Sequence, residues 1–173
     1  MRALVAWFCC AAATVSAAGL SPEAEKALMG RANEYLQSAQ QGDADKFLRL
    51  THPALHGLFG GKEPFEAATR AALKALAGKP AVTAVTFGRV LGPLLVGDEE
   101  LCFLPTSVSA RLGNQATETN SYYIAVRTVG SAEWRFIDAA GLRRRPEALW
   151  QLFPGLPKDV ALPRNEVSVK TAK

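Results

Sequence analysis

The residues of this chain best suited to acid–base chemistry lie in the segment Trp134-Arg135-Phe136-Ile137-Asp138. Side chains alternate between the two faces of a strand, so Trp134, Phe136 and Asp138 would share one face. A carboxyl group among aromatic rings has a raised pKa and can act as a general base near neutral pH. We favour a structural alternative, in which Asp138 accepts hydrogen bonds from backbone amides of the following loop.

Two tyrosines and a histidine are candidates to act with Asp138. Tyr35 belongs to the apolar stripe of a predicted helix, which would turn it toward the sheet. In an isomerase or dehydratase of a small carbonyl substrate, Tyr35 or Tyr123 would stabilise the developing oxyanion, and His52 would move a proton. The sequence alone does not bring these residues together.

The aromatic residues also fit a protein that binds without catalysing. Trp134, Phe136 and Tyr35 would then line a pocket for a small apolar ligand. The candidate acid–base residues are scattered along the chain, and each has a structural role available to it. We therefore expect a non-catalytic binding module for a small ligand or an envelope protein, with the acid–base enzyme as the alternative.

Motifs for cofactor, metal or thiol chemistry are missing from the sequence. It has no GxSxG segment, P-loop or Rossmann glycine pattern, so we expect no cofactor. His52 and His56 are four residues apart, but Pro53 lies between them and no third ligand is near, which disfavours a metal site. Cys102 lies in an apolar strand and is expected to be a small buried hydrophobic residue rather than a reactive thiol.

The segment Arg143-Arg144-Arg145 is the strongest local concentration of positive charge. It could contact an acidic surface or a phosphate, or form a solvated turn. A net charge of +4 over 173 residues gives no broad basic surface, so nucleic-acid binding is not expected. A third interpretation is an interaction protein of the cell envelope that uses these arginines as its contact.

Residues 1–18 have the layout of a secretory signal peptide. Arg2 precedes an apolar run, Ala3–Val15, which is shorter than the roughly 20 residues that a membrane-spanning helix needs. Small residues follow, and cleavage is expected after Ala17 or Ala18. We therefore predict a periplasmic or secreted protein without a stable membrane anchor after cleavage.

Apolar periodicity predicts helices in the first half of the remaining chain. The first begins at Ser21-Pro22 and ends at Gly42, the second is capped by Asp43, and a turn over Pro53–Phe59 precedes the third. That third helix is expected over residues 62–77.

Strand composition follows the helices. The expected strands are residues 81–91, 99–112, 115–129 and 133–138, followed by a short helix at 146–152. Helices followed by strands indicate an α+β fold rather than alternating βαβ units. The predicted domain covers residues 19–163, and residues 164–173 are expected to form a flexible tail.

Four segments carry a resemblance to a known family. They are Gln41-Gly42-Asp43, His52-Pro53-Ala54-Leu55 with Gly60-Gly61-Lys62, the Trp134–Asp138 segment, and Leu152-Phe153-Pro154-Gly155-Leu156-Pro157. Their order and spacing resemble uncharacterised exported bacterial proteins of the nuclear transport factor 2-like, or cystatin-like, superfamily. One departure is His52, because the resemblance leads us to expect an aromatic residue before that proline.

The resemblance implies an α+β fold with three N-terminal helices packed on a curved antiparallel sheet, or cone, but it does not decide the function. Similar folds include isomerases, dehydratases, ligand binders and protein-binding modules. Their enzymes place an aspartate or histidine with tyrosines inside the cone, which would make Asp138 the carboxylate and Tyr35 or Tyr123 its partner. The resemblance also implies a homodimer through the sheet.

Overall fold

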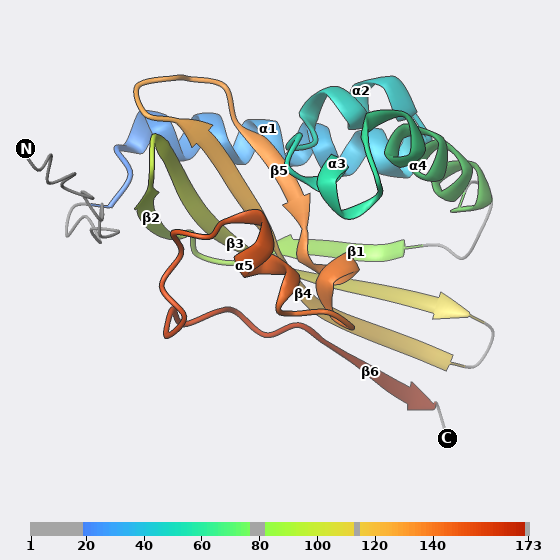
Figure 1. Ribbon diagram of the computed structural model, residues 1–173. Helices are drawn as coiled ribbons and strands as arrows, with labels where there is room; N and C mark the ends of the chain where they lie inside the picture. Colours follow the sequence, from blue (N-terminus) through green and yellow to red (C-terminus); the bar gives the residue numbers. More distant parts are fainter. Residues whose placement is uncertain (1–18, 77–81, 113–114, 172–173) are drawn as a thin grey trace, which may run out of the picture.

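The computed structural model describes residues 19–76, 82–112 and 115–171. Within these residues, four helices precede a six-stranded antiparallel sheet, and a short helical segment lies between the last two strands (Figure 1). This order confirms the predicted α+β class. The predicted signal peptide lies outside the described residues.

The elements have the following bounds. The helical elements are α1 (Pro22–Gln41), α2 (Ala44–Leu50), α3 (Leu55–Leu58), α4 (Lys62–Leu76), the 3-10 helix η1 (Ala139–Leu142) and α5 (Ala148–Leu152). The strands are β1 (Val82–Phe87), β2 (Leu91–Val96), β3 (Glu99–Leu112), β4 (Gln115–Thr128), β5 (Arg135–Asp138) and β6 (Glu166–Thr171).

Both ends of α1 are those that the sequence predicts. The Ser21 side chain accepts a hydrogen bond from the backbone N–H of Ala24 at 3.2 Å. Gly42 ends the helix in the left-handed conformation, with a φ of 70°, which glycine adopts without a steric penalty. The face of α1 between these caps buries Leu28, Ala32, Tyr35 and Ser38.

The chain after α2 differs from the prediction. Asp43 caps α2 as expected, accepting from the Lys46 N–H at 3.0 Å. The segment predicted as a turn contains the four-residue helix α3, so four helices precede the sheet. Between α2 and α3 the chain is extended, and Thr51 forms a parallel bridge with Phe136 of β5. This bridge ties the helices to the sheet.

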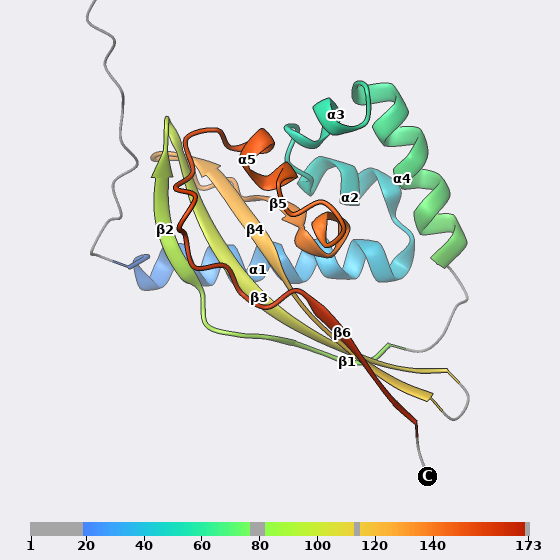
Figure 2. The ribbon, with the colours of Figure 1, turned by 60° about the horizontal axis from the view of Figure 1, so that its bottom comes forward.

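Two long strands form the centre of the sheet. β3 and β4 pair along their whole length, and each has two shorter strands end to end at its outer edge (Figure 2). β2 and β1 pair with β3, whereas β5 and β6 pair with β4. The sequence prediction missed β2, because its apolar residues were divided between the end of one expected strand and the following loop.

Pro105 does not mark an edge or a bulge in β3, contrary to the sequence prediction. It lies where the neighbour of β3 changes from β1 to β2, and its carbonyl accepts from the Gly88 N–H at 2.8 Å. In an antiparallel strand the N–H and C=O of one residue point to the same side. Because Pro105 has no N–H and lies where β1 ends and β2 begins, its position costs β3 few hydrogen bonds.

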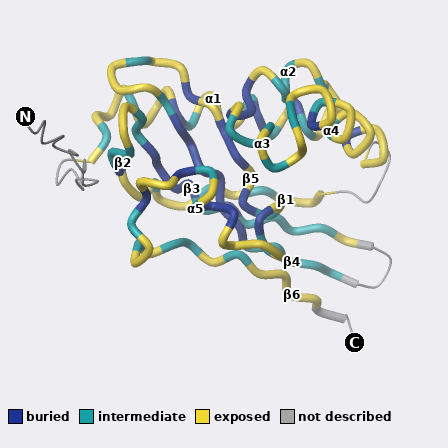
Figure 3. The backbone as a smooth tube through the Cα atoms, viewed as in Figure 1, coloured by how far each residue is buried: buried dark blue, intermediate teal, exposed yellow. Residues whose placement is uncertain are grey.

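Only half of the sheet is covered on both faces (Figure 3). In this covered half, Cys102, Leu104 and Tyr123 pack beneath α1, and their neighbours Leu101, Phe103 and Ile124 face α5 and the chain after it. The other half consists of β1, β6 and the adjoining parts of β3 and β4, and it extends past the helices. We call it the free half.

Part of the segment predicted as a flexible tail, residues 166–171, forms a strand. These residues form β6 and pair antiparallel with β4. Val167 and Val169 alternate with polar residues, which is the pattern of an edge strand with one apolar face. The free edge of β4 gives this short pattern a partner that the sequence does not reveal.

Candidate functional site

A cavity of about 310 Å³ lies between α3, α4 and the chain that follows β5. We call it the Asp138 pocket. Its lining is mainly apolar, with Phe47, Leu55, Leu58, Phe59, Phe65, Gly141, Leu142 and Ala148. The polar side chains that line it are Tyr35, Thr51, Thr69, Asp138 and Arg145. An apolar cavity with a few converging polar groups is the usual form of a small-molecule site.

Asp138 lies at the end of β5, where the chain turns into η1. Its Oδ1 accepts a hydrogen bond from the Ala140 N–H at 2.8 Å, so the predicted structural role is confirmed. By surface area Asp138 is an exposed residue that lines the pocket, although many protein atoms lie around its carboxylate. This burial raises the pKa of Asp138 above its ordinary value, against the hydrogen bond from Ala140 and the charge of Arg143.

Both predicted tyrosines lie beside Asp138. Tyr123 is its partner in the β4–β5 register. Tyr35 of α1 meets the Tyr123 ring edge-on, with 5.2 Å between centroids, and stacks on Phe136 at 5.4 Å. Burial, and secondarily the charge of Asp138, raises the pKa of both phenols, so both hydroxyls keep their protons at neutral pH. Of the two tyrosines near Asp138, only Tyr35 lines the pocket with it.

His52 does not join this group. It follows Thr51 in an extended segment, so the two side chains point to opposite faces. Thr51 lines the Asp138 pocket, whereas His52 Nε2 lies 3.0 Å from Glu99 Oε1 and its ring packs against Phe153. Burial lowers the pKa of His52, although Glu99 opposes this effect. His52 therefore links the segment after α2 to Glu99 at the start of β3, on the face of the sheet opposite Asp138. The predicted proton transfer between His52 and Asp138 has no geometric basis.

Trp134 and Phe136 are buried and do not line the Asp138 pocket. Phe136 is fully buried under Tyr35. The Trp134 ring lies 4.6 Å from the guanidinium carbon of Arg127, which pairs with Glu100 at 2.6 Å. The strand alternation that groups them with Asp138 is correct, but α1 covers this part of the face. Of the three predicted ligand-binding residues, only Tyr35 reaches the pocket.

The three consecutive arginines diverge. Arg143 donates from Nε to Asn165 Oδ1 at 3.1 Å, whereas Arg145 lines the Asp138 pocket and lies 3.9 Å from Glu147. Arg144 is exposed. They therefore do not form one contact surface.

Cys102 is a core residue, as predicted. It is fully buried beneath α1, and burial raises the pKa of its thiol to about 12. Such a thiol is protonated at neutral pH and is a poor nucleophile.

Sequence reasoning missed most of the pocket lining. Thr51, Arg145 and the apolar residues of α3 and α4 come from segments far apart in the chain. One sequence signal was available for Thr51. The residue before a proline is usually extended, so the His52-Pro53 segment indicates an extended chain, which in the structure lies against β5 at Thr51.

Comparison of the chain with protein-family models, with curated proteins and with solved structures gave no significant match. Within the described residues, no helix is long and apolar enough to span a membrane. The described residues also contain no group of three or more His, Cys, Asp or Glu side chains placed to hold a metal ion.

Proposed function

We propose that this chain is an exported protein that binds a small, largely apolar molecule in the Asp138 pocket. The observation that carries the proposal is the cavity of about 310 Å³, in which apolar side chains surround one carboxyl group and a tyrosine. Ligand sites in proteins have volumes from roughly 300 to 1,000 Å³. The pocket therefore suits a compact ligand of one or two rings.

The polar groups limit what the ligand can be. Asp138 uses Oδ1 for the Ala140 N–H, which leaves its second oxygen for a donor on the ligand. The neutral Tyr35 hydroxyl, which lines the pocket, can donate to a carbonyl or hydroxyl oxygen. A small apolar molecule with one donor and one acceptor fits this arrangement best.

The proposal includes the nuclear transport factor 2-like cone and the exported location. The succession of helices followed by one antiparallel sheet supports the cone, and residues 1–18 support export by their composition alone. Among proteins of similar fold, ligand binding and acid–base chemistry use the same interior, so the fold does not separate them.

Acid–base catalysis is the second candidate, and the raised pKa of Asp138 favours it. Asp138 would remove a proton next to a carbonyl group, and the Tyr35 hydroxyl would stabilise the resulting oxyanion, whereas Tyr123 does not line the pocket. This role requires the second carboxylate oxygen to face the substrate. His52 has no part in it, because its side chain lies across the sheet.

A fluorescent apolar probe of suitable size, N-phenyl-1-naphthylamine, tests the binding proposal. We expect the purified protein to bind it, and we expect Leu58→Trp, which fills the Asp138 pocket, to abolish binding. Leu48→Trp is the matched control, because Leu48 is a similarly half-buried leucine on the neighbouring helix and does not line this pocket. Equal probe binding by both variants and the wild type would contradict the proposal.

A homodimer through the sheet is the partner that we propose. On one face of the free half, the register aligns the uncharged side chains Val85, Val108, Thr119 and Val167. Val167 and Val169 are 49% and 57% exposed on this face. Two copies can meet through uncharged faces without repulsion between like charges.

Light scattering at micromolar concentration tests the dimer. We expect a dimer for the wild type and a monomer for Val108→Lys, which places a charge in the middle of the face. Thr86→Lys on the opposite face of β1 is the control and should remain dimeric. A monomeric wild-type protein would overturn this part of the proposal.

A further inference from the structure

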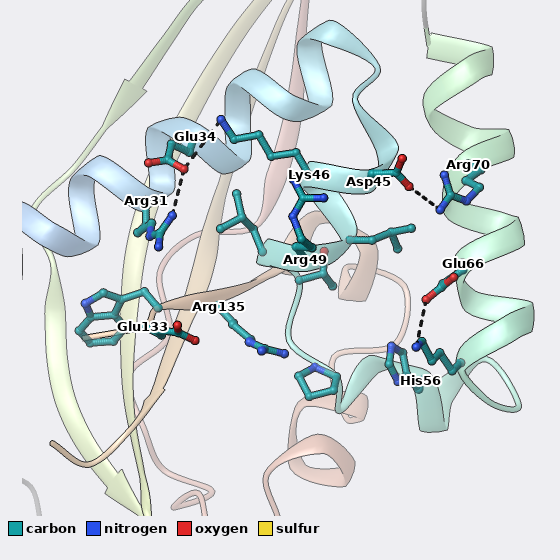
Figure 4. A pocket seen from close by; sticks show the side chains of 16 residues that line it. Arg31, Glu34, Asp45, Lys46, Arg49, His56, Glu66, Arg70, Glu133 and Arg135 are labelled. Carbon is teal, nitrogen blue, oxygen red and sulfur yellow. Dashed lines mark hydrogen bonds and ion pairs between the residues drawn. The ribbon is translucent and has the colours of Figure 1, made fainter. Parts of the chain in front are cut away.

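A second hollow, of about 700 Å³, lies beside α2 and has only Thr51 in common with the lining of the Asp138 pocket (Figure 4). We call it the charged cleft. Side chains of α1, α2, α3, α4 and the start of β5 line it. Its cationic residues are Arg31, Lys46, Arg49, Lys62, Arg70 and Arg135, and its carboxylates are Glu34, Asp45, Glu66 and Glu133. The lining thus carries two more positive than negative charges.

Most of these charges are paired at the margins of the cleft. On the α1 side, Glu34 lies 3.1 Å from Arg31 and 3.8 Å from Lys46. On the α4 side, Arg70 lies 2.7 Å from Asp45, and Lys62 lies 3.8 Å from Glu66. These pairs satisfy the cations that could otherwise attract an anion.

Arg49 and Arg135 are different. Within the part of the chain that the structure describes, no carboxylate lies within ion-pair distance of either guanidinium. Figure 4 shows both side chains between the two paired groups, Arg49 coming from α2 and Arg135 from β5. Glu133 also lines the cleft without an ion pair, and it is too far from Arg135 to form one.

The backbone fixes the two arginines near each other. The Thr51–Phe136 bridge and the hydrogen bond from the His52 N–H to the Phe136 carbonyl, at 2.9 Å, join the segment after α2 to β5. Arg49 precedes one side of this junction by two residues, and Arg135 precedes the other by one. Two like charges held on adjoining segments repel each other, and an anion between them removes that repulsion.

We propose that the charged cleft binds the oxyanion group, phosphate or carboxylate, of a small organic molecule between Arg49 and Arg135. A guanidinium presents parallel N–H donors that match two oxygens of such a group. The cleft is larger than a free phosphate ion, and Leu48 and Pro53 provide apolar surface for the remainder of the molecule. This site is separate from the Asp138 pocket and does not depend on the function proposed for that pocket.

Calorimetric titration with inorganic phosphate and with succinate, at constant ionic strength, tests the site. We expect the full-length mature protein to bind at least one of them, and Arg49→Gln and Arg135→Gln each to weaken binding about tenfold or more. Arg144→Gln is the matched control, because Arg144 is an exposed arginine outside the cleft. Its affinity should equal that of the wild type.

Two further measurements separate the remaining outcomes. Arg135→Lys keeps the charge but loses the paired donors, so it should weaken binding although thermal unfolding shows a folded protein. Sedimentation with phosphatidylglycerol vesicles distinguishes a lipid phosphate from a soluble one, and either source supports the site if Arg49→Gln reduces binding. Absence of binding to phosphate, succinate and vesicles, or binding that the Arg49→Gln/Arg135→Gln double variant retains, would overturn the proposal.

Discussion

The Asp138 pocket and the charged cleft share Thr51 in their linings, yet they have opposite chemistry. The pocket surrounds a carboxyl group with apolar side chains, and burial raises the pKa of Asp138. The cleft surrounds its carboxylates with cations, and the hydrogen bond from Arg70 lowers the pKa of Asp45. The chain from Leu48 to Leu58 adjoins both hollows: Leu48, Arg49 and Leu50 line the cleft, Leu55 and Leu58 line the pocket, and Thr51 lines both.

This contrast indicates different ligands for the two hollows. The pocket contains one carboxyl group, the guanidinium of Arg145 and neutral hydroxyls in a mainly apolar lining, so it suits an apolar molecule with few polar atoms. The cleft has unpaired guanidiniums and polar surroundings, so it suits an anion. Variants that change one hollow should therefore leave ligand binding in the other hollow unchanged.

The largest expected effect concerns the core beneath the Asp138 pocket. Phe136→Ala removes a fully buried ring that stacks on Tyr35, and it should lower the free energy of unfolding by about 3–5 kcal/mol. Urea denaturation measures this change. Phe59→Ala is the control, because Phe59 lines the same pocket but is 48% exposed, and it should cost less than about 1 kcal/mol. Similar losses of unfolding free energy for both variants would show that Phe136 is not part of a core that supports the pocket.

The next effect separates the two sites by their probes. Leu58→Trp should abolish binding of N-phenyl-1-naphthylamine and leave the affinity for the cleft anion unchanged. Arg135→Gln should do the reverse, with a loss of anion affinity of about tenfold or more. Fluorescence and calorimetry on the same protein samples measure both. If either variant impaired both probes in a protein that unfolds at the wild-type temperature, the two hollows would be one site.

A smaller effect should distinguish Asp138 of the pocket from Asp45 of the cleft by the pH dependence of the free energy of unfolding. The folded-state pKa of Asp138 is raised, so stability should fall as pH rises from the unfolded value of about 3.9 through the folded value. Asp138→Asn keeps the acceptor for the Ala140 N–H and should remove this fall. Because more than a third of Asp138 is exposed, solvent screening keeps this fall smaller than it would be for a fully buried carboxyl group.

Asp45 should show the opposite sign. Its lowered pKa contributes stability above the unfolded value, and this contribution is lost as pH falls through the folded value. Denaturation of Asp45→Asn, Asp138→Asn and the wild type between pH 3 and 8 gives the two difference curves. Curves with the same sign would contradict the contrast between the hollows.

The smallest effect concerns a paired arginine of the cleft. Arg31→Gln breaks the ion pair between Arg31 and Glu34. The side chain of Arg31 is 44% exposed and that of Glu34 is 40% exposed. Exposed pairs contribute little, so the free energy of unfolding should change by less than about 1 kcal/mol. Anion affinity should also change far less than in Arg49→Gln. A loss equal to that of Arg49→Gln would show that pairing does not decide which arginine binds.

The sequence predicted features that depend on neighbours in the chain. The caps Ser21, Gly42 and Asp43 and the hydrogen bond from Ala140 to Asp138 act within a few residues. Strand alternation also placed Phe136 and Asp138 on one face. Such features need no knowledge of the tertiary structure.

The sequence did not predict what depends on contacts between distant segments. His52 was grouped with Asp138 by residue type, but the extended chain at Thr51 turns it to the other face. The strand β6 depends on the free edge of β4, and the charged cleft depends on a bridge between residues 51 and 136. Periodicity along the chain carries no information on such pairings.

The most direct test of the central claim is a ¹³C NMR titration of the Asp138 carboxyl group with and without N-phenyl-1-naphthylamine. If Asp138 belongs to an apolar ligand pocket, its pKa will lie above the ordinary value of about 3.9 and will rise further when the probe excludes water. A pKa at or below 3.9 that the probe does not change would contradict the claim.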